Sequence, residues 1–199
     1  RTTGTPLMMI LKNRDAEPGA YEAIKDKFRP GHADYTYFAK YGIRDWRGSG
    51  RASGRETAGR VAAGAVAKVI LAGRGVTVRA YTVKAAGISC KVYNPEVIED
   101  NPLRACDPEA AVRMEEHIAE LKDQDDSAGG VVECRITGLP PGLGEPVFDK
   151  LDAVLAKAIL SIGAVKGIEF GAGFAAADMR GSQHNDEMSA DGFFTNNAG

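Results

Sequence analysis

The sequence has few of the residues that build disulfide frameworks and metal sites. It contains only three cysteines and three histidines in 199 residues. Cys90, Cys106 and Cys134 are odd in number, and none has a spacing typical of metal ligands. Neither a disulfide scaffold nor a metal site is therefore expected, and reduced thiols in a cytosolic protein are the simplest interpretation.

Long apolar runs and an excess of one charge are also missing. No apolar run approaches the ~18 residues of a membrane-spanning helix, and 25 basic residues against 27 acidic ones leave a net charge of −2. Such a chain has no overall field that would attract nucleic acid. What remains is the composition of an ordinary globular protein, 44% hydrophobic and 26% charged, and long enough to bury a core.

Hydrophobic spacing predicts helices and strands that are interspersed along the chain. Helical periodicity is found at residues 55–72, 109–122 and 146–162. Strands are predicted at residues 7–11, 76–85, 88–93, 131–137, 165–170 and 174–179. Short links join several of the strand pairs, which favours a mixed α+β fold with antiparallel sheet. Residues 28–54 have many glycines and no apolar period, so an irregular loop is expected there.

This loop, extended to Thr57, has the composition of a binding site for an anion. The thirty residues from Phe28 to Thr57 hold five arginines, five glycines and six of the fourteen aromatic residues. Guanidinium groups bind phosphate and carboxylate in a bidentate manner, and glycines let the backbone approach a ligand closely. A small phosphorylated molecule is the expected ligand, and His32 is the one group in the loop suited to exchange a proton near neutral pH.

The position of Arg55 supports the same interpretation. It is predicted to lie in the first turn of the helix at residues 55–72, where a cation opposes the helix dipole by a few tenths of a kcal/mol or more. An anion bound between the two would remove the conflict. Arg44, Arg47 and Arg51 are less specific, and some of them are expected to pair with Asp34, Asp45 or Glu56 and so keep the loop in shape.

The same segment resembles the chorismate synthase family. The resemblance begins with RPGHADYT at residues 29–36, KYGIRD at 40–45 and RASGRET at 51–57. It continues in the family's order with GLPPGLGEPVFD at 138–149, AVKG at 164–167, EFGAGF at 169–174 and GSQHNDE at 181–187. It covers essentially the whole chain and is weakest between about residues 74 and 107.

The resemblance implies a fold and a reaction. The fold would be a β-α-β sandwich with helices packed between antiparallel sheets. Residues 1–199 would form a single domain that is the incomplete central part of a larger one. The reaction would convert 5-enolpyruvylshikimate 3-phosphate to chorismate and phosphate by 1,4-elimination with reduced FMN, in the shikimate pathway of aromatic amino-acid biosynthesis. The family further implies a lyase acting as a cytoplasmic homotetramer without nucleic-acid or membrane partners. It leaves open whether this protein reduces its own flavin with NADPH.

The resemblance also assigns residues. Arg29 and Arg55 match arginines that bind the substrate, and His32 matches one of two catalytic histidines, acting near the flavin as a proton donor. The flavin contacts would be Arg51, Ala52 and Ser53, with a second contact at Gly163 and Ala164. The chain departs from the common pattern at several of these places, because Ala52 replaces a serine, Gly54 an alanine and Gly163 an asparagine. His117 and His184 are not expected to act in chemistry.

Two other interpretations stay open. The family's other catalytic histidine, further substrate arginines and a third flavin segment would fall before Arg1 or after Gly199. A polypeptide of only these residues is therefore expected to be a catalytically silent flavin- or phosphate-binding fragment of low stability. An RNA-binding domain that uses the basic aromatic loop is the third interpretation, and the net charge opposes it.

Overall fold

A computed structural model describes residues 3–190 and 192–199. The chain divides into two compact units: the chain up to Gly64 together with Pro141–Gly199, and Ala65–Pro140. Helix α2 (Thr57–Ala72) crosses the boundary between them. Both units combine helices with short antiparallel sheets, so the predicted mixed α+β class is confirmed. No helix in the described part of the chain is long and apolar enough to cross a membrane.

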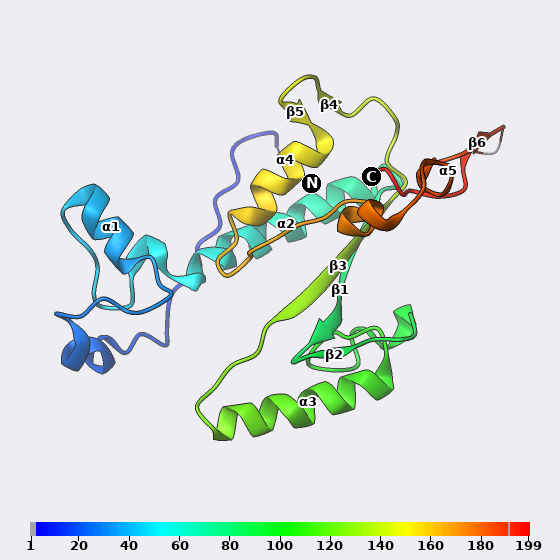
Figure 1. Cartoon of the computed structure of the whole chain (residues 1–199). Coiled ribbons are helices and arrows are strands. Elements are labelled where there is room, and N and C mark those ends of the chain that lie inside the picture. Colours follow the sequence, from blue (N-terminus) through cyan, green and yellow to red (C-terminus); the bar gives the residue numbers. More distant parts are fainter. Residues whose placement is uncertain (1–2, 191) are drawn as a thin grey trace. The chain divides into compact units, whose positions relative to one another are not determined.

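The second unit is built on an antiparallel sheet of order β2-β1-β3. Strands β1 (Thr77–Ala85) and β3 (Gly130–Thr137) pair along almost their full length, and β2 (Ile88–Ser89) adds a short edge (Figure 1). Helix α3 (Pro108–Asp123) packs beside β2. The core lies between these elements in two groups: Ala105, Ala110, Ala111 and Met114, and Tyr81, Ile98 and Cys106.

Asp107 fixes the start of α3. Its carboxylate accepts the backbone N–H groups of Glu109 and Ala110 at 3.1 Å each, as a helix N-cap does, and Pro108 occupies the first turn. The other carboxylate oxygen accepts the N–H groups of Lys91 and Val92 at 2.8 and 3.3 Å. One buried side chain thus joins the helix to the segment that follows β2.

The first unit holds shorter elements. Its helices are α1 (Asp34–Tyr41), the first two turns of α2, α4 (Leu151–Leu160) and α5 (Gly181–His184). Its hairpins are β4 (Gly144–Glu145) with β5 (Asp149–Lys150), and β6 (Met188–Ser189) with β7 (Gly192–Phe193). Its 3₁₀ turns are η1 (Pro18–Ile24), η2 (Gly50–Ala52), η3 (Gly54–Glu56) and η5 (Gly173–Asp178). The remaining 3₁₀ turn that the structure describes, η4 (Pro95–Val97), belongs to the second unit.

Several sequence-based expectations were wrong. Residues 34–41 form the helix α1 inside the expected loop, because the run DYTYFAKY holds neither glycine nor proline and Gly42 ends it in a left-handed conformation. Residues 7–11 are exposed and pair with no described strand. Residues 165–170 form no strand either, and residues 174–179 lie mostly in η5. Helix α4 starts only at Leu151, because the β4–β5 hairpin takes the residues before it.

The apolar side chains of α2 are exposed in this structure. No described residue of this helix is buried, and Val61, Val69 and Ile70 are each more than half exposed. The spacing predicted the helix correctly. An apolar helix of this kind is typically covered on most sides, and the described residues do not cover it in this way.

Candidate active site

The loop of residues 28–57, called the ligand loop from here on, lies within the first unit. A turn that leads into α1 orders its first residues. Gly31 has a φ of +67°, which glycine adopts without strain, and the His32 N–H donates to the Arg29 carbonyl at 3.3 Å. Helix α1 starts two residues after His32 and ends at Gly42, whose N–H donates to the Phe38 carbonyl at 2.8 Å. The turn thereby brings Arg29 and His32 to the start of the helix.

Asp34 is the centre of this arrangement. It is 3% exposed, and one carboxylate oxygen, Oδ1, lies 2.9 Å from His32 Nδ1. The other oxygen, Oδ2, lies 3.2 Å from both Arg29 Nε and Arg44 Nη1. Arg29 Nη2 is also 3.0 Å from His32 Nε2. Four charged or titratable side chains are therefore joined in one network.

Burial alone would raise the pKa of Asp34. The hydrogen bond and charge of Arg29, with a smaller contribution from His32, outweigh burial, so the pKa of this carboxyl lies below its ordinary value. Asp34 is consequently ionised at neutral pH. A buried carboxylate of this kind is stable only with such partners.

The arginines of the loop also hold its backbone and side chains in place. Arg29 donates to the hydroxyl of the buried Ser49, which has a φ of 77°. Arg44 donates to the Lys25 carbonyl and lies 5.0 Å from the centre of the Phe28 ring. The expectation that some arginines pair with acids of the loop is confirmed for Arg44 with Asp34, and for Arg51 with Glu56 at 3.1 Å.

The tripeptide expected to contact the flavin lies just before α2, with Arg51 and Ala52 in η2 and Ser53 between η2 and η3. Ala52 N–H donates to the Ser49 carbonyl at 2.9 Å and Ser53 N–H to the Gly50 carbonyl at 3.1 Å, so neither amide is available to a ligand. Ser53 Oγ accepts the Arg55 N–H at 3.2 Å and keeps its own hydrogen to donate. Arg55 is exposed, and among the described residues no carboxylate pairs with its guanidinium. Ser53 and Arg55 are therefore the free donors of this segment.

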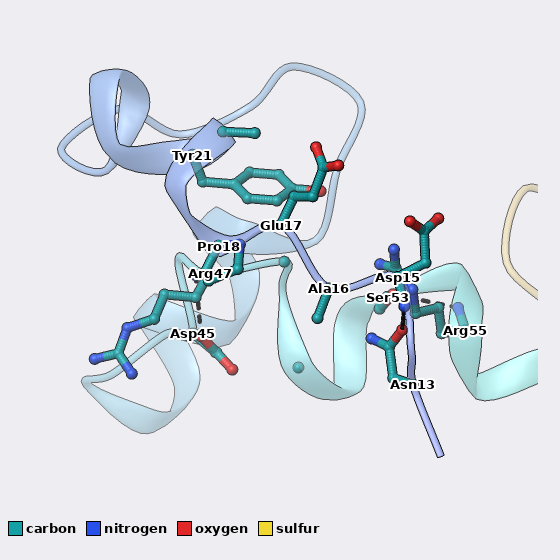
Figure 2. Close-up of a pocket in the computed structure, with 13 residues that line it drawn as sticks. Asn13, Asp15, Ala16, Glu17, Pro18, Tyr21, Asp45, Arg47, Ser53 and Arg55 are labelled. Atoms are coloured by element: carbon teal, nitrogen blue, oxygen red, sulfur yellow. Dashed lines mark hydrogen bonds between the residues drawn. The ribbon is translucent and has the colours of Figure 1, made fainter. Parts of the chain in front are cut away.

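A pocket of about 480 Å³ lies beside these donors. Figure 2 shows Ser53 and Arg55 near Asn13 at one end, and Tyr21 and Arg47 at the other. Its volume is in the range of small-molecule sites. The full lining is Asn13, Asp15, Ala16, Glu17, Pro18, Ala20, Tyr21, Asp45, Arg47, Gly48, Gly50, Ser53 and Arg55. Two guanidiniums and two hydroxyls, those of Ser53 and Tyr21, suit an anion with several acceptor oxygens. The three carboxylates of the lining disfavour an anion close to them.

The second expected flavin contact is the turn after α4. Ala164 has a φ of +69°, and within the described chain nothing accepts the backbone N–H of Gly163 or Ala164. Two exposed amide donors are thus available at this turn. Arg60 Nη2 donates to the Ser161 carbonyl at 2.9 Å and to its hydroxyl at 3.0 Å, which ties the turn to α2 five residues after Arg55.

The structure joins Arg29 directly to His32 and places Arg55 with Ser53 at one pocket. Among the described residues no hydrogen bond or ion pair joins these two pairs, although the Arg29 guanidinium lies 5.5 Å from the centre of the Tyr21 ring, which lines the pocket. His117 lies on α3 in the other unit, 3.1 Å from Glu120, and His184 lies in α5. Sequence reasoning missed that Asp34 holds His32, although the two are only two residues apart. It also missed Ser49 and Arg60, and no local signal could have found Arg60, whose partner lies 101 residues away.

Comparison with known proteins agrees with these features. The family model described as chorismate synthase matches residues 1–199. The chorismate synthase of Syntrophobacter fumaroxidans is 58% identical over 198 residues, which are 100% of this chain and 56% of that protein. The chorismate synthase of Methanosarcina mazei is 53% identical over 207 aligned residues, covering 100% of this chain and 57% of that protein.

A solved structure, described as the crystal structure of chorismate synthase, has a TM-score of 0.73 and 37% identity. It covers 82% of this chain, and the match takes in 55% of the solved chain. This chain therefore spans about half the length of the relatives it matches. A family match that runs from the first residue to the last shows that the chain belongs to the chorismate synthase family.

Proposed function

We propose that this protein acts as a chorismate synthase, a lyase that eliminates phosphate from 5-enolpyruvylshikimate 3-phosphate to give chorismate. The observation that carries the proposal is the network around His32. A histidine beside an ionised carboxylate, with an arginine next to its ring, combines a proton-exchanging group with an anion-binding group. The substrate, an anion with a phosphate and two carboxylates, needs both.

Arg29 and Arg55 are proposed to bind the substrate. Arg55 has an exposed guanidinium without a carboxylate partner among the described residues, and it lies just before α2. A bound anion would compensate its unfavourable position at the helix N-terminus. Arg29 is held through Nε by Asp34 and presents Nη2 beside His32, so a bound anion oxygen would lie close to the histidine.

His32 is proposed to hold or move a proton during the elimination. Its side chain is 25% exposed, which allows it to reach a ligand while its Nδ1 stays on Asp34. A positioned acid–base group of this kind contributes on the order of 10²–10⁴ in rate.

Reduced FMN is the proposed cofactor, and the residues present fit it. The Ser53 hydroxyl and the N–H groups of Gly163 and Ala164 are free to donate to the acceptor atoms of a flavin. Ala52 would contribute shape rather than a hydrogen bond, because its amide is already used. Reduced flavin would supply an electron-rich ring beside the substrate, without net oxidation or reduction.

An anaerobic titration tests this function. Reduced FMN and 5-enolpyruvylshikimate 3-phosphate are added to the protein, and flavin absorbance and chorismate are measured together. Saturable spectral change with chorismate release supports the proposal. A spectral change without chorismate supports the alternative of flavin binding without turnover, and no spectral change removes the flavin assignment.

We further propose, from family membership, a cytoplasmic homotetramer that acts as a single domain on a small molecule. Light scattering coupled to size exclusion measures the oligomeric state. Flavin reduction by added NADPH under anaerobic conditions decides whether the protein reduces its own cofactor. These two measurements are independent of the turnover assay.

A further inference from the structure

Asp34 is a buried carboxylate to which the proposed reaction assigns no role. It is the first residue of α1, where an acidic side chain commonly bonds to the free N–H groups of the helix. The structure shows no side-chain cap at this helix start. The carboxylate of Asp34 instead bonds back to the loop, to His32, Arg29 and Arg44.

Asp34 is the partner that distinguishes the two ring nitrogens of His32. Its ionised carboxylate only accepts hydrogen bonds, and Oδ1 lies 2.9 Å from Nδ1, so the hydrogen of the neutral ring is favoured on Nδ1. Arg29 Nη2 lies 3.0 Å from Nε2 and 3.3 Å from Nδ1, so the guanidinium does not by itself select one nitrogen. The carboxylate therefore selects the neutral form.

We propose that Asp34 is a positioning residue, which holds His32 in the Nδ1–H form and leaves Nε2 as the atom that exchanges a proton. The inference deepens the proposed function and rests on it for the role of that proton. Its structural part, the form of the His32 ring, stands by itself.

The same carboxylate places Arg29 for the exchange. Oδ2 holds Arg29 through Nε, the inner nitrogen of the guanidinium. The outer nitrogen Nη2 stays beside the His32 ring, so an anion bound to this guanidinium would lie next to the ring. Asp34 thereby links the anion-binding arginine to the proton-exchanging nitrogen.

The ring nitrogens can be observed directly by NMR. The full chain is labelled with ¹⁵N-histidine, and its three ring spectra are assigned with the variants His117→Gln and His184→Gln. Wild-type His32 is expected in the Nδ1–H form when neutral. The urea-unfolded chain is the reference in which solvent averages the two forms, because Nδ1 of the folded His117 also lies beside a carboxylate, 3.1 Å from Glu120. A neutral His32 in the Nε2–H form, or averaged as in the unfolded chain, overturns the proposal.

The variant Asp34→Asn isolates the charge. An amide can turn its NH₂ toward Nδ1 and so favour the other ring form. The His32 signals are expected to move toward Nε2–H or an average, whereas Glu120→Gln leaves them unchanged. Unchanged His32 signals in a folded Asp34→Asn protein contradict the proposal. If this variant does not fold, the wild-type spectrum decides.

Turnover gives the second readout. Asp34→Asn is expected to lower kcat by about 10-fold or more, and by no more than the 10²–10⁴ that a positioned acid–base group contributes. In a protein that already carries His32→Ala, the same change should lower kcat little further, because both substitutions remove the same proton exchange at His32. Fully multiplicative losses would contradict positioning through His32. A wild-type protein without turnover would remove the proposed function, while the ring spectra would still decide the role of Asp34.

Discussion

At the scale of single residues, the loop holds two groups of ligand-binding candidates, one around His32 and one at Arg55. His32 contacts Asp34 and Arg29, whereas Arg55 lies at the pocket with a guanidinium unpaired by any described carboxylate. The two positions should therefore respond differently to truncation, since one affects the chemical step and the other affects the bound ligand.

We expect His32→Ala to lower kcat by at least about 10-fold, because an acid–base group contributes on the order of 10²–10⁴, while substrate binding survives. Arg55→Ala should mainly weaken substrate binding, because it leaves an anionic group unpaired. Steady-state kinetics and ligand titration measure the two effects. His117→Ala is the matched control and should behave as wild type. Near-normal turnover of His32→Ala would make His32 a structural residue.

Asp107 gives a stability prediction at the same scale. Backbone N–H groups, first that of Lys91 and then that of Ala110, hold the pKa of this carboxyl below its ordinary value despite burial. Asp107→Ala should lower the free energy of unfolding by roughly 2–3 kcal/mol at pH 7, since a cap and two further acceptor contacts are lost. Urea unfolding measures this, with the exposed neighbour Glu109→Gln as control.

The pH dependence of this loss has a definite sign. Because the pKa of Asp107 is lower in the folded than in the unfolded state, its contribution is fully present above the unfolded value of about 3.9. It is lost as the pH falls through the folded value. The stability difference between wild type and Asp107→Ala should therefore be constant from about pH 7 to 5 and narrow below about pH 4. A difference that grows on acidification would contradict this assignment.

At the scale of elements, two glycines show what a turn requires and what packing adds. Gly87, between β1 and β2, and Gly138, after β3, have φ values of +79° and +78°. A Cβ on Gly87 would meet no atom within 4 Å, whereas a Cβ on Gly138 would lie 2.2 Å from the Gly75 carbonyl oxygen. The backbone strain is the same at both, and only Gly138 has the close approach.

Gly87→Ala is expected to cost about 1–2 kcal/mol of stability from backbone strain alone. Gly138→Ala should cost at least about 2 kcal/mol more, because the turn after β3 must move away from Gly75. The urea midpoints of the two variants measure these losses of stability. If Gly138→Ala does not fold, the yields of folded protein are compared instead. Equal losses of stability in the two variants would mean that the turn after β3 moves away from Gly75 at no cost, which would contradict this prediction.

At the scale of the whole molecule, burial is uneven between the two units. The fully buried apolar side chains found in the described residues all lie between Val76 and Met114, in the second unit. The buried residues of the first unit are polar, Asp34 and Ser49. Local stability follows apolar burial, so the ligand loop belongs to the less stable part.

Hydrogen exchange should reproduce this difference. The slowest amides are expected in β1, in the part of β3 that bonds to it, and in α3 near Met114. Amides of α1 and of residues 44–56 should exchange faster by at least about 10-fold, a difference of only ~1.4 kcal/mol in opening free energy. Exchange followed by mass spectrometry measures this. Slowest exchange in the ligand loop would contradict the assignment of the core.

Local patterns in the sequence predicted much of this protein. The spacing of apolar residues predicted α2, β1, α3 and β3 to within two residues at each end, because helix and strand periods are local properties of the chain. The motifs from Arg29 to Thr57 indicated the family, and they led to the prediction, which stays a prediction, of an anion site that shares one loop with His32. Tertiary contacts were not needed to single out this loop or its arginines, glycines and histidine as candidates.

The tertiary structure decided which atoms meet. Gly173 was expected in a turn between two strands. The turn, however, packs its backbone against the chain end, where Ala172 N–H donates to the Asn197 carbonyl at 2.8 Å. Arg60 meets Ser161 across 101 residues, and Asp34 turns away from its helix to hold His32. The contacts of Arg60 and Ala172 join chain segments far apart, and that of Asp34 depends on the burial of its charge. No local period of the sequence contains either kind of information.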